Sequence, residues 1–219
     1  MLSRLKASLL LLAMMGCTVV NADDSIAKPG IKHVPHRTDT ALVMNRNMYQ
    51  IQQDTSTIQF RVESPFGDIW GSFEDFEGSF FVLTNGMHNQ SAVVDINTDS
   101  LYVDSSFIKA ILKSEMFFDV EKCSSMRFVG SSLEWFNDRK GVLKGELTIN
   151  NVTRQIAFYL ELVTPDIENE YSERITIKAS TTIKRSRFGI HTLLPAVSDN
   201  VNIFMNIDAL KKNTAVSMI

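Results

Sequence analysis

Residues 174–184 read RITIKASTTIK, and residues 201–209 read VNIFMNIDA. In the first run, apolar side chains occupy most odd positions from Ile175 to Ile183, and polar or charged ones occupy the even positions. The second run repeats this alternation, with Phe204 as the exception. Because successive side chains of a strand point to opposite faces, both runs predict strands with one apolar and one polar face. Two such strands joined by a loop favour an antiparallel sheet around a single apolar interior.

The same alternation recurs upstream, between turn signals such as Asn85-Gly86 and Asn150-Asn151. Short turns join most neighbouring runs, so the strands are expected to be mainly antiparallel. About eight one-sided strands indicate a β-barrel or a β-sandwich, and a barrel of that size either fills its interior with side chains or holds one small ligand. The further strands are predicted at 57–63, 69–76, 78–83, 91–97, 125–135, 143–149 and 155–162.

One short helix is predicted between the central strands, within residues 104–114. Ser105 or Ser106 can cap its N-terminus, because a hydroxyl oxygen there accepts a bond from an unpaired helix amide. The fold class is therefore all-β with a single short helix. The apolar stripe expected to pack inward consists of Phe107, Ile108, Ile111 and Leu112.

The N-terminus has the pattern of a secretory signal peptide over residues 1–22. Two basic residues precede the short apolar run Ala7–Met15, and Val20-Asn21-Ala22 is a small-residue cleavage site. The apolar run is too short to span a bilayer comfortably. We therefore expect a periplasmic or secreted protein. An alternative is a membrane-anchored lipoprotein, because Met14-Met15-Gly16-Cys17 loosely resembles a lipobox with an acylated Cys17.

Residues 23–47 are polar and lack periodicity, which predicts a flexible leader before a domain at 48–212 and a short tail at 213–219. His33 and His36 have a spacing that an ordered helix could use for a metal. Pro35 lies between them and nothing else frames a site, so we interpret them as solvated and expect no metal.

Charge and cysteine content narrow the function classes. The chain has a net charge of −3, and removal of a basic signal peptide makes the domain more acidic, which argues against nucleic-acid binding. If Cys17 is lost with the signal, Cys123 remains alone and cannot form an internal disulfide. Cys123 is then expected to be a small packed apolar residue.

An enzymatic interpretation lacks a nucleophile motif. Ser186, His191 and Asp199 are the only close-set residues of the triad types, and no Gly-x-Ser-x-Gly sequence is present. We therefore expect no catalytic activity and no catalytic cofactor. Arg185 and Arg187 suggest a different role, because they could form an ion pair with Asp199 that holds the loop or could meet a polar headgroup.

Several motifs in fixed order, from Tyr49 to Leu210, together make the chain resemble the YceI-like family of secreted bacterial proteins. None of them is decisive alone. They are YQI at 49–51, STIQF at 56–60, GSF at 71–73, FEG at 76–78, KSEMFFDV at 113–120, GELTI at 145–149, VTR at 152–154, IKRSRFGI at 183–190 and VSDNV at 197–201.

The resemblance implies a lipocalin-like antiparallel barrel with an elongated apolar cavity. It implies that this cavity holds the tail of an isoprenoid quinone, a polyprenyl-type lipid or a similar amphiphile, without catalysis. The chain departs from the family pattern at Glu63, where a His is usual, in the helix around Ser106–Ala110, and at Cys123-Ser124, where Tyr-Pro is usual. These departures leave the cavity mouth and the headgroup preference open.

From the alternation and the resemblance we expect one set of side chains to line the cavity. The expected function is a carrier or store for a long-chain isoprenoid lipid, as a monomer or homodimer. The alternative is a non-enzymatic module with a filled barrel that docks a membrane redox protein. The expected ligand-binding residues are Ile58, Phe60, Val62, Trp70, Phe117, Phe118, Phe128, Phe158, Ile175, Ile177, Ile190, Ile203 and Met205.

Overall fold

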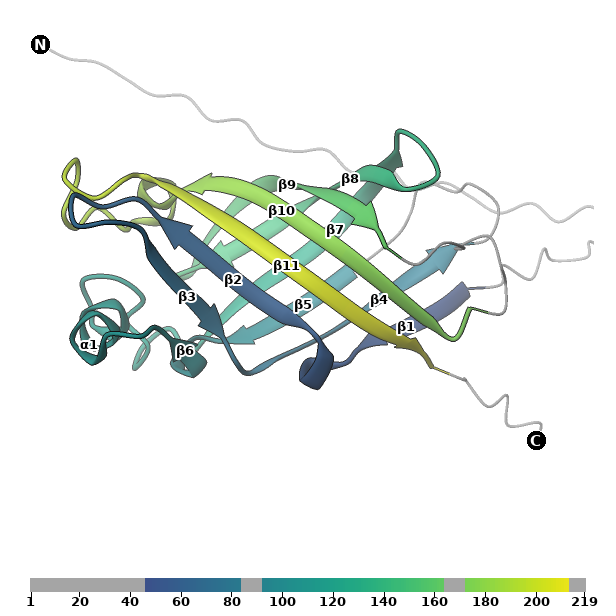
Figure 1. The fold of residues 1–219 in the computed structure, drawn as a ribbon, viewed down its shortest axis with the longest axis horizontal. Coiled ribbons are helices and arrows are strands. Elements are labelled where there is room, and N and C mark those ends of the chain that lie inside the picture. Colours follow the sequence, from purple (N-terminus) through teal and green to yellow (C-terminus); the bar gives the residue numbers. More distant parts are fainter. Residues whose placement is uncertain (1–45, 84–91, 164–171, 213–219) are drawn as a thin grey trace, which may run out of the picture. The chain divides into compact units, whose positions relative to one another are not determined.

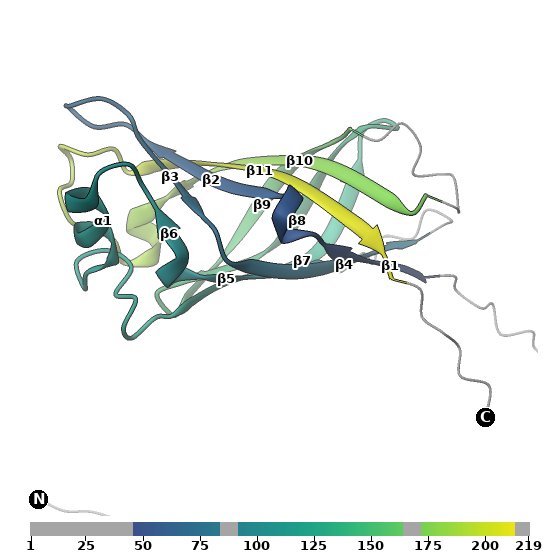
Figure 2. The same ribbon diagram turned by 60° about the horizontal axis from the view of Figure 1, so that its bottom comes forward.

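The computed structural model describes residues 46–83, 92–163 and 172–212. Its strands are β1 (Arg46–Ile51), β2 (Thr57–Val62), β3 (Ile69–Phe73), β4 (Phe76–Leu83), β5 (Ala92–Asn97), β6 (Leu101–Tyr102), β7 (Ser125–Trp135), β8 (Lys140–Ile149), β9 (Val152–Leu162), β10 (Arg174–Lys184) and β11 (Asn200–Lys211). The antiparallel ring β1-β4-β5-β7-β8-β9-β10-β11 closes where β11 pairs with β1 (Figures 1 and 2). The predicted eight-stranded barrel is confirmed.

The predicted signal peptide, the tail and nearly all of the predicted leader lie outside the described residues, as do Cys17, His33 and His36. β1 begins at Arg46, so the last two residues of the predicted leader belong to the sheet. β1 and β6 were not among the predicted strands, and β8 and β9 each begin three residues before the predicted runs. Outside the run at 69–76, the other boundaries follow the alternation within two residues, because each inward apolar side chain fixes which residues face the interior.

Three wall positions of the barrel are each built from two successive strands. β1 and β2 both pair with β11, where Ile51 lies opposite Ala209 and Val62 lies opposite Val201. In the same way β4 and β3 form the second position, and β5 and β6 form the third. The sequence predicted one run over 69–76, and the structure divides it at Glu74 and Asp75.

The three breaks lie side by side and are joined by hydrogen bonds. Two of them are the 3-10 turns η1 (Gln53–Thr55) and η2 (Thr98–Ser100). The Gln53 side-chain amide donates to the Glu74 carbonyl at 2.6 Å, and the Glu74 amide donates to the Ser100 carbonyl at 3.3 Å. Backbone groups that leave the strand ladder therefore find new partners instead of remaining unpaired.

Helix α1 (Ser106–Lys113) roofs one end of the barrel. The Ser105 hydroxyl oxygen accepts from the Ile108 amide at 3.3 Å, which confirms the predicted N-cap. Ile108, Ile111 and Leu112 pack against the core as expected. Phe107 does not: it is 73% exposed, because it lies at the edge of the stripe, roughly 100° from Ile108 and roughly 140° from Leu112 around the helix.

The two ends of the barrel differ in how they are filled. At the end formed by β1 and β4, Tyr49, Leu162, Ile175 and Ala209 form a compact buried cluster, here called the closed end. At the other end, here called the cavity end, lie α1, the β2–β3 turn and the loop between η3 (Arg185–Phe188) and β11 (Figures 1 and 2). The β7–β8 turn is on the side of the closed end.

Candidate ligand-binding cavity

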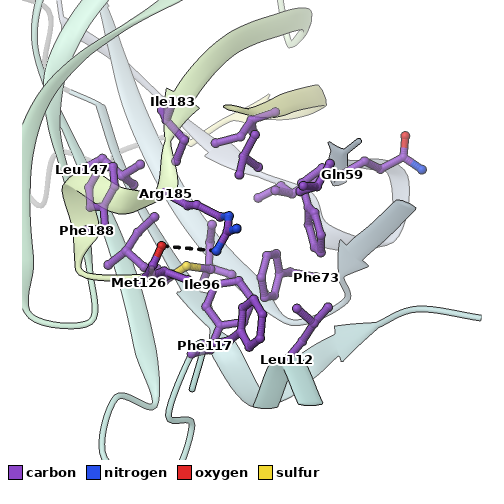
Figure 3. A pocket seen from close by; sticks show the side chains of 18 of the residues that line it. Gln59, Phe73, Ile96, Leu112, Phe117, Met126, Leu147, Ile183, Arg185 and Phe188 are labelled. Atoms are coloured by element: carbon purple, nitrogen blue, oxygen red, sulfur yellow. Dashed lines mark hydrogen bonds between the residues drawn. The ribbon is translucent and has the colours of Figure 1, made fainter. Parts of the chain in front are cut away.

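The cavity end encloses an apolar cavity of about 200 Å³. Side chains from β2, β3, β5, β7, β8, β9, β10 and β11 form its wall, α1 forms its roof, and η3 with the following loop forms one side. Among the described residues that line it, Gln59 and Arg185 are the only polar ones, and the Gln59 side chain is exposed on the outer face of β2 and points away from the other lining groups (Figure 3). The space is therefore suited to hydrocarbon rather than to a polar substrate.

Most of the predicted ligand-binding residues lie where the alternation placed them. They come from separate strands and loops, and their side chains converge on this one space. Those lining the cavity are Ile58, Phe60, Val62, Phe117, Phe118, Phe128, Phe158, Ile190, Ile203 and Met205.

The other three predicted residues do not line this cavity. Trp70 points outward from β3 and stacks on Phe204 with ring centroids 5.9 Å apart. Ile175 belongs to the packed cluster of the closed end, beyond the reach of the cavity. Ile177 is partly buried between that cluster and the main core. Alternation gives the face of a strand but not the height along the barrel, so it could not separate Ile175 from Ile203.

Phenylalanine rings build much of the wall. Phe73 contacts both Phe60 and Phe118, with centroids 5.8 Å apart in each pair, and Phe128 meets Phe158 edge-on at 5.2 Å. Such tilted and edge-on contacts are the favourable ones for aromatic pairs. Gly71 allows the Phe60 ring to enter this space, since a Cβ at that position would collide with the ring.

The roof and η3 also contribute to the lining, which the sequence pattern did not indicate. Ile108, Ile111 and Leu112 line the cavity, although they were expected only to pack inward. Phe188 is almost fully buried and lines the cavity from η3. No periodicity marks a turn of this length, so the signal for Phe188 was only its place inside the motif at 183–190.

Arg185 is the one charged group of the lining, and its side chain is part of the loop architecture. The residue is 5% exposed, and its guanidinium donates to the carbonyls of Ser198 (2.9 Å), Thr192 (2.7 Å), Val197 (3.0 Å) and Ile190 (3.3 Å). Desolvation lowers the pKa of Arg185, although the nearby Asp199 carboxylate opposes this. The guanidinium carbon also lies 5.9 Å from the centre of the Phe117 ring.

The loop that follows η3 is held by these contacts of Arg185 with backbone carbonyls. The predicted direct ion pair with Asp199 is not among the contacts of Arg185, and four carbonyl oxygens hold the guanidinium in its place. Arg187 is exposed. The carbonyl contacts fix the loop across the side of the cavity.

The sequence profile of the YceI-like domain matches residues 49–209. This chain belongs to the YceI-like family. A UPF0312 protein of Serratia proteamaculans (strain 568) is 26% identical over 155 residues, which cover 70% of this chain and 80% of that protein. BcnA of Burkholderia cenocepacia superposes with a TM-score of 0.65 at 18% identity, covering 72% of this chain and 98% of BcnA.

A polyisoprenoid-binding domain from Saccharophagus degradans superposes on this YceI-like chain with a TM-score of 0.59 at 14% identity. The superposition covers 75% of this chain and 98% of that domain. At such identities the likeness establishes the fold. It agrees with the lipocalin-like barrel that the motifs implied.

The residues considered as a triad do not assemble in the YceI-like barrel. The Asp199 carboxylate accepts from the amide (2.9 Å) and the hydroxyl (2.8 Å) of Ser186. Desolvation works against the charged form, but these two bonds together with the charges of Lys184 and Arg185 outweigh it and lower the pKa of Asp199. His191 is exposed, and within the described ranges no hydrogen bond joins it to either residue.

The residues that the structure describes are 46–83, 92–163 and 172–212. Among them, no cluster of three or more His, Cys, Asp or Glu side chains could hold a metal ion. No helix within these residues has the length and apolar character to cross a membrane.

The YceI-like wall has a slit between β9 and β10. Their pairing runs from Ile177–Leu162 to Ser180–Tyr159 and then stops, although both strands continue. A groove outside the barrel occupies the place of the next pairs. Ile183 and Phe188 line both this groove and the cavity, so the wall is one side chain thick there.

Proposed function

We propose that this YceI-like barrel holds the apolar tail of a long-chain isoprenoid lipid, an isoprenoid quinone or a polyprenyl-type amphiphile, for transport, storage or sequestration. The observation that carries the proposal is an apolar cavity with walls from eight strands. Each methylene group removed from water contributes about 0.8 kcal/mol, so a tail gains strongly from such a site. The name of the Saccharophagus degradans domain, which binds a polyisoprenoid, supports the ligand class.

The size of the cavity limits how the lipid is held. Its volume of about 200 Å³ is below the range of roughly 300–1,000 Å³ that is typical of ligand pockets. A long tail therefore occupies it only if lining side chains move apart or if part of the lipid extends through an opening. Recognition by hydrocarbon contact makes the selection among tails loose, with length and width as the main limits.

Catalysis is not part of the proposed function. A hydrocarbon tail among phenylalanine and aliphatic side chains meets no nucleophile or general base. The charged lining group, Arg185, already donates to four carbonyl oxygens of its own loop. A binding role is the function that this arrangement supports best.

We also propose that the protein is exported and acts in the periplasm after cleavage behind Ala22. The basic residues, the short apolar run and Val20-Asn21-Ala22 support this. Intact-mass measurement of the exported protein is expected to give a chain that begins at Asp23. A diacylated chain that begins at Cys17 would show an anchored lipoprotein instead.

Blocking the cavity tests the binding proposal. Ile203→Trp places an indole inside the cavity, whereas Phe204→Trp places the same group on the outer face of the same strand. Protein purified from its native compartment is extracted with solvent, and the extract is measured by mass spectrometry. We expect isoprenoid lipid from the wild type and from Phe204→Trp, and at least about a fivefold loss from Ile203→Trp.

Circular dichroism first checks that both variants keep the barrel. An extract of the wild type without lipid would contradict the proposal. Equal lipid content in Ile203→Trp and the wild type would place the lipid outside this cavity.

A further inference from the structure

Four large apolar side chains are exposed at the cavity end and come from three separate segments. Phe66 in the β2–β3 turn is 100% exposed, and Phe107 in α1 is 73% exposed. Leu193 in the η3–β11 loop is 57% exposed, and Met116 after α1 is 51% exposed. We call these four residues the apolar rim. Figures 1 and 2 show the three segments together at one end of the barrel.

The apolar rim lies at an opening of the cavity. Leu193 lines the cavity and is also more than half exposed, so it marks the place where the interior meets the solvent. The Thr192 hydroxyl donates to the Met116 carbonyl at 2.7 Å, which ties this loop to the turn after α1. The Ser198 amide donates to the Glu63 carbonyl at 2.9 Å, which ties it to the β2–β3 hairpin. These two bonds join the three segments that carry the rim residues.

Rim segments have paired much of their polar backbone locally. The Ser64 hydroxyl donates to the Gly67 carbonyl at 2.6 Å, and the Gly67 amide donates to the Ser64 carbonyl at 3.1 Å. The Val197 amide donates to the Leu193 carbonyl at 2.9 Å. Unpaired peptide groups are strongly unfavourable in an apolar medium. Turns whose backbone groups hydrogen-bond within the turn are therefore suited to burial in an apolar layer.

Charges near the apolar rim are largely balanced. Asp68, next to the turn, pairs with Arg61 at 3.0 Å, and Lys113 at the end of α1 pairs with Asp99 at 2.7 Å. A strongly charged partner would gain little from such a surface. An uncharged or zwitterionic partner that offers an apolar layer fits it better.

We propose that the apolar rim docks on the surface of a lipid bilayer and inserts its four side chains into the boundary between headgroups and acyl chains. Docking in this position sets the cavity mouth against the membrane, so a lipid tail passes between bilayer and barrel without crossing water. The transfer of a lipid tail through the docked mouth rests on the proposed function. The exposure and position of the rim are independent of that function.

Binding to vesicles tests the inference. The double variant Phe66→Ser with Phe107→Ser removes the two most exposed rim groups. The matched control is Phe136→Ser with Val163→Ser, because both of these side chains are exposed and follow β7 and β9 at the closed end. The full-length mature protein is mixed with large unilamellar phosphatidylcholine vesicles, and the bound fraction is measured by flotation at low and at high salt.

We expect the wild type and the control to bind similarly, and the rim variant to lose at least about tenfold in partition coefficient at both salt concentrations. Three results would overturn the inference: a wild type that does not float with the vesicles, a rim variant that binds like the control, or binding that high salt abolishes.

Solvent extraction of the same preparations separates this inference from the proposed function. Wild-type protein that holds isoprenoid lipid but does not bind vesicles refutes the docking alone. Wild-type protein that binds vesicles through the rim but holds no lipid refutes the carrier role alone.

Discussion

Ile175 and Ile203 lie on adjacent strands, both face the interior, and they meet opposite surroundings. Ile175 is 1% exposed and lies opposite Ala209, whose small side chain lets its neighbours pack closely. Ile203 is only partly buried, because it borders the cavity. At the closed end β1 and β4 complete the ring, whereas at the cavity end α1 and loops replace the sheet as cover. The same strand pattern therefore supports a packed core in one half and a hollow one in the other.

This difference predicts which half carries stability and which half carries binding. A packed half gains dispersion contacts on all sides of each side chain, and a hollow half lacks partner atoms on one side. We therefore expect substitutions at the closed end to act on unfolding. Substitutions at the cavity end are expected to act on ligand content, except where a polar network holds the cavity wall.

The exception gives the largest expected effect. Arg185→Met leaves the carbonyls of Ile190, Thr192, Val197 and Ser198 without the guanidinium, so the free energy of unfolding should fall by about 4 kcal/mol. Urea unfolding measures the change. The control Arg187→Ala is exposed and should stay within about 0.5 kcal/mol of the wild type. Equal effects of the two would mean that the carbonyl contacts do not hold the loop.

The direct comparison of the two halves gives the next largest effect. Ile175→Ala opens a void in a packed cluster and should lower the free energy of unfolding by about 3 kcal/mol. Ile203→Ala enlarges an existing cavity and should lower it by about 1 kcal/mol. Both are measured on lipid-free protein by urea unfolding. Similar losses at the two positions would show that the cavity end is packed as tightly as the closed end.

The smallest expected effects are on the pH dependence of stability. The closed end should lose stability at alkaline pH, and the cavity end should lose it at acid pH. Burial raises the pKa of Tyr49 above its usual 10.0, with a smaller contribution from Glu173. The contribution of Tyr49 to stability should therefore be fully present below pH 10.0 and should be lost as pH rises through the raised pKa. The pKa of Asp199 lies below its usual 3.8. Its contribution should be fully present above that pH and should be lost as pH falls through the lowered value.

Tyr49→Phe should remove the alkaline loss, at the expense of about 1 kcal/mol for the hydrogen bond to the Ser172 carbonyl. Asp199→Asn should remove the acid loss. Unfolding free energies measured across pH check both signs. An alkaline loss that persists in Tyr49→Phe would have to come from another group.

The strands, the N-cap of α1 and most of the cavity wall could be predicted, because alternation and capping are local properties of the sequence. Even the outward position of Trp70 was accessible, since Ile69, Gly71 and Phe73 share the opposite face of β3. The boundary between the packed half and the hollow half of the barrel could not be predicted from the sequence. It depends on where β1 gives way to β2 beside β11, and that register is set by contacts far apart in the chain.

Loop chemistry was the other part that sequence could not supply. Arg185 reads as a surface cation beside an acidic residue, yet its partners are carbonyls that only the folded loop brings together. The prediction that Phe107 packs inward was wrong for a simpler reason. It was grouped with Ile108, Ile111 and Leu112 as one apolar stripe, although it lies at the edge of that stripe, roughly 140° from Leu112 around the helix.

The slit between β9 and β10 gives the barrel a built-in line of weakness. Each of these strands is fully paired on its other side, with β8 and with β11. Backbone amides of 181–184 that point toward β9 have no ladder partner there, so hydrogen exchange should register them well before their neighbours at 177–180. The wall is a rolled sheet with a partly open margin at which Ile183 and Phe188 lie between the cavity and the outer groove, so a widening of this margin is expected to widen the cavity without breaking any strand.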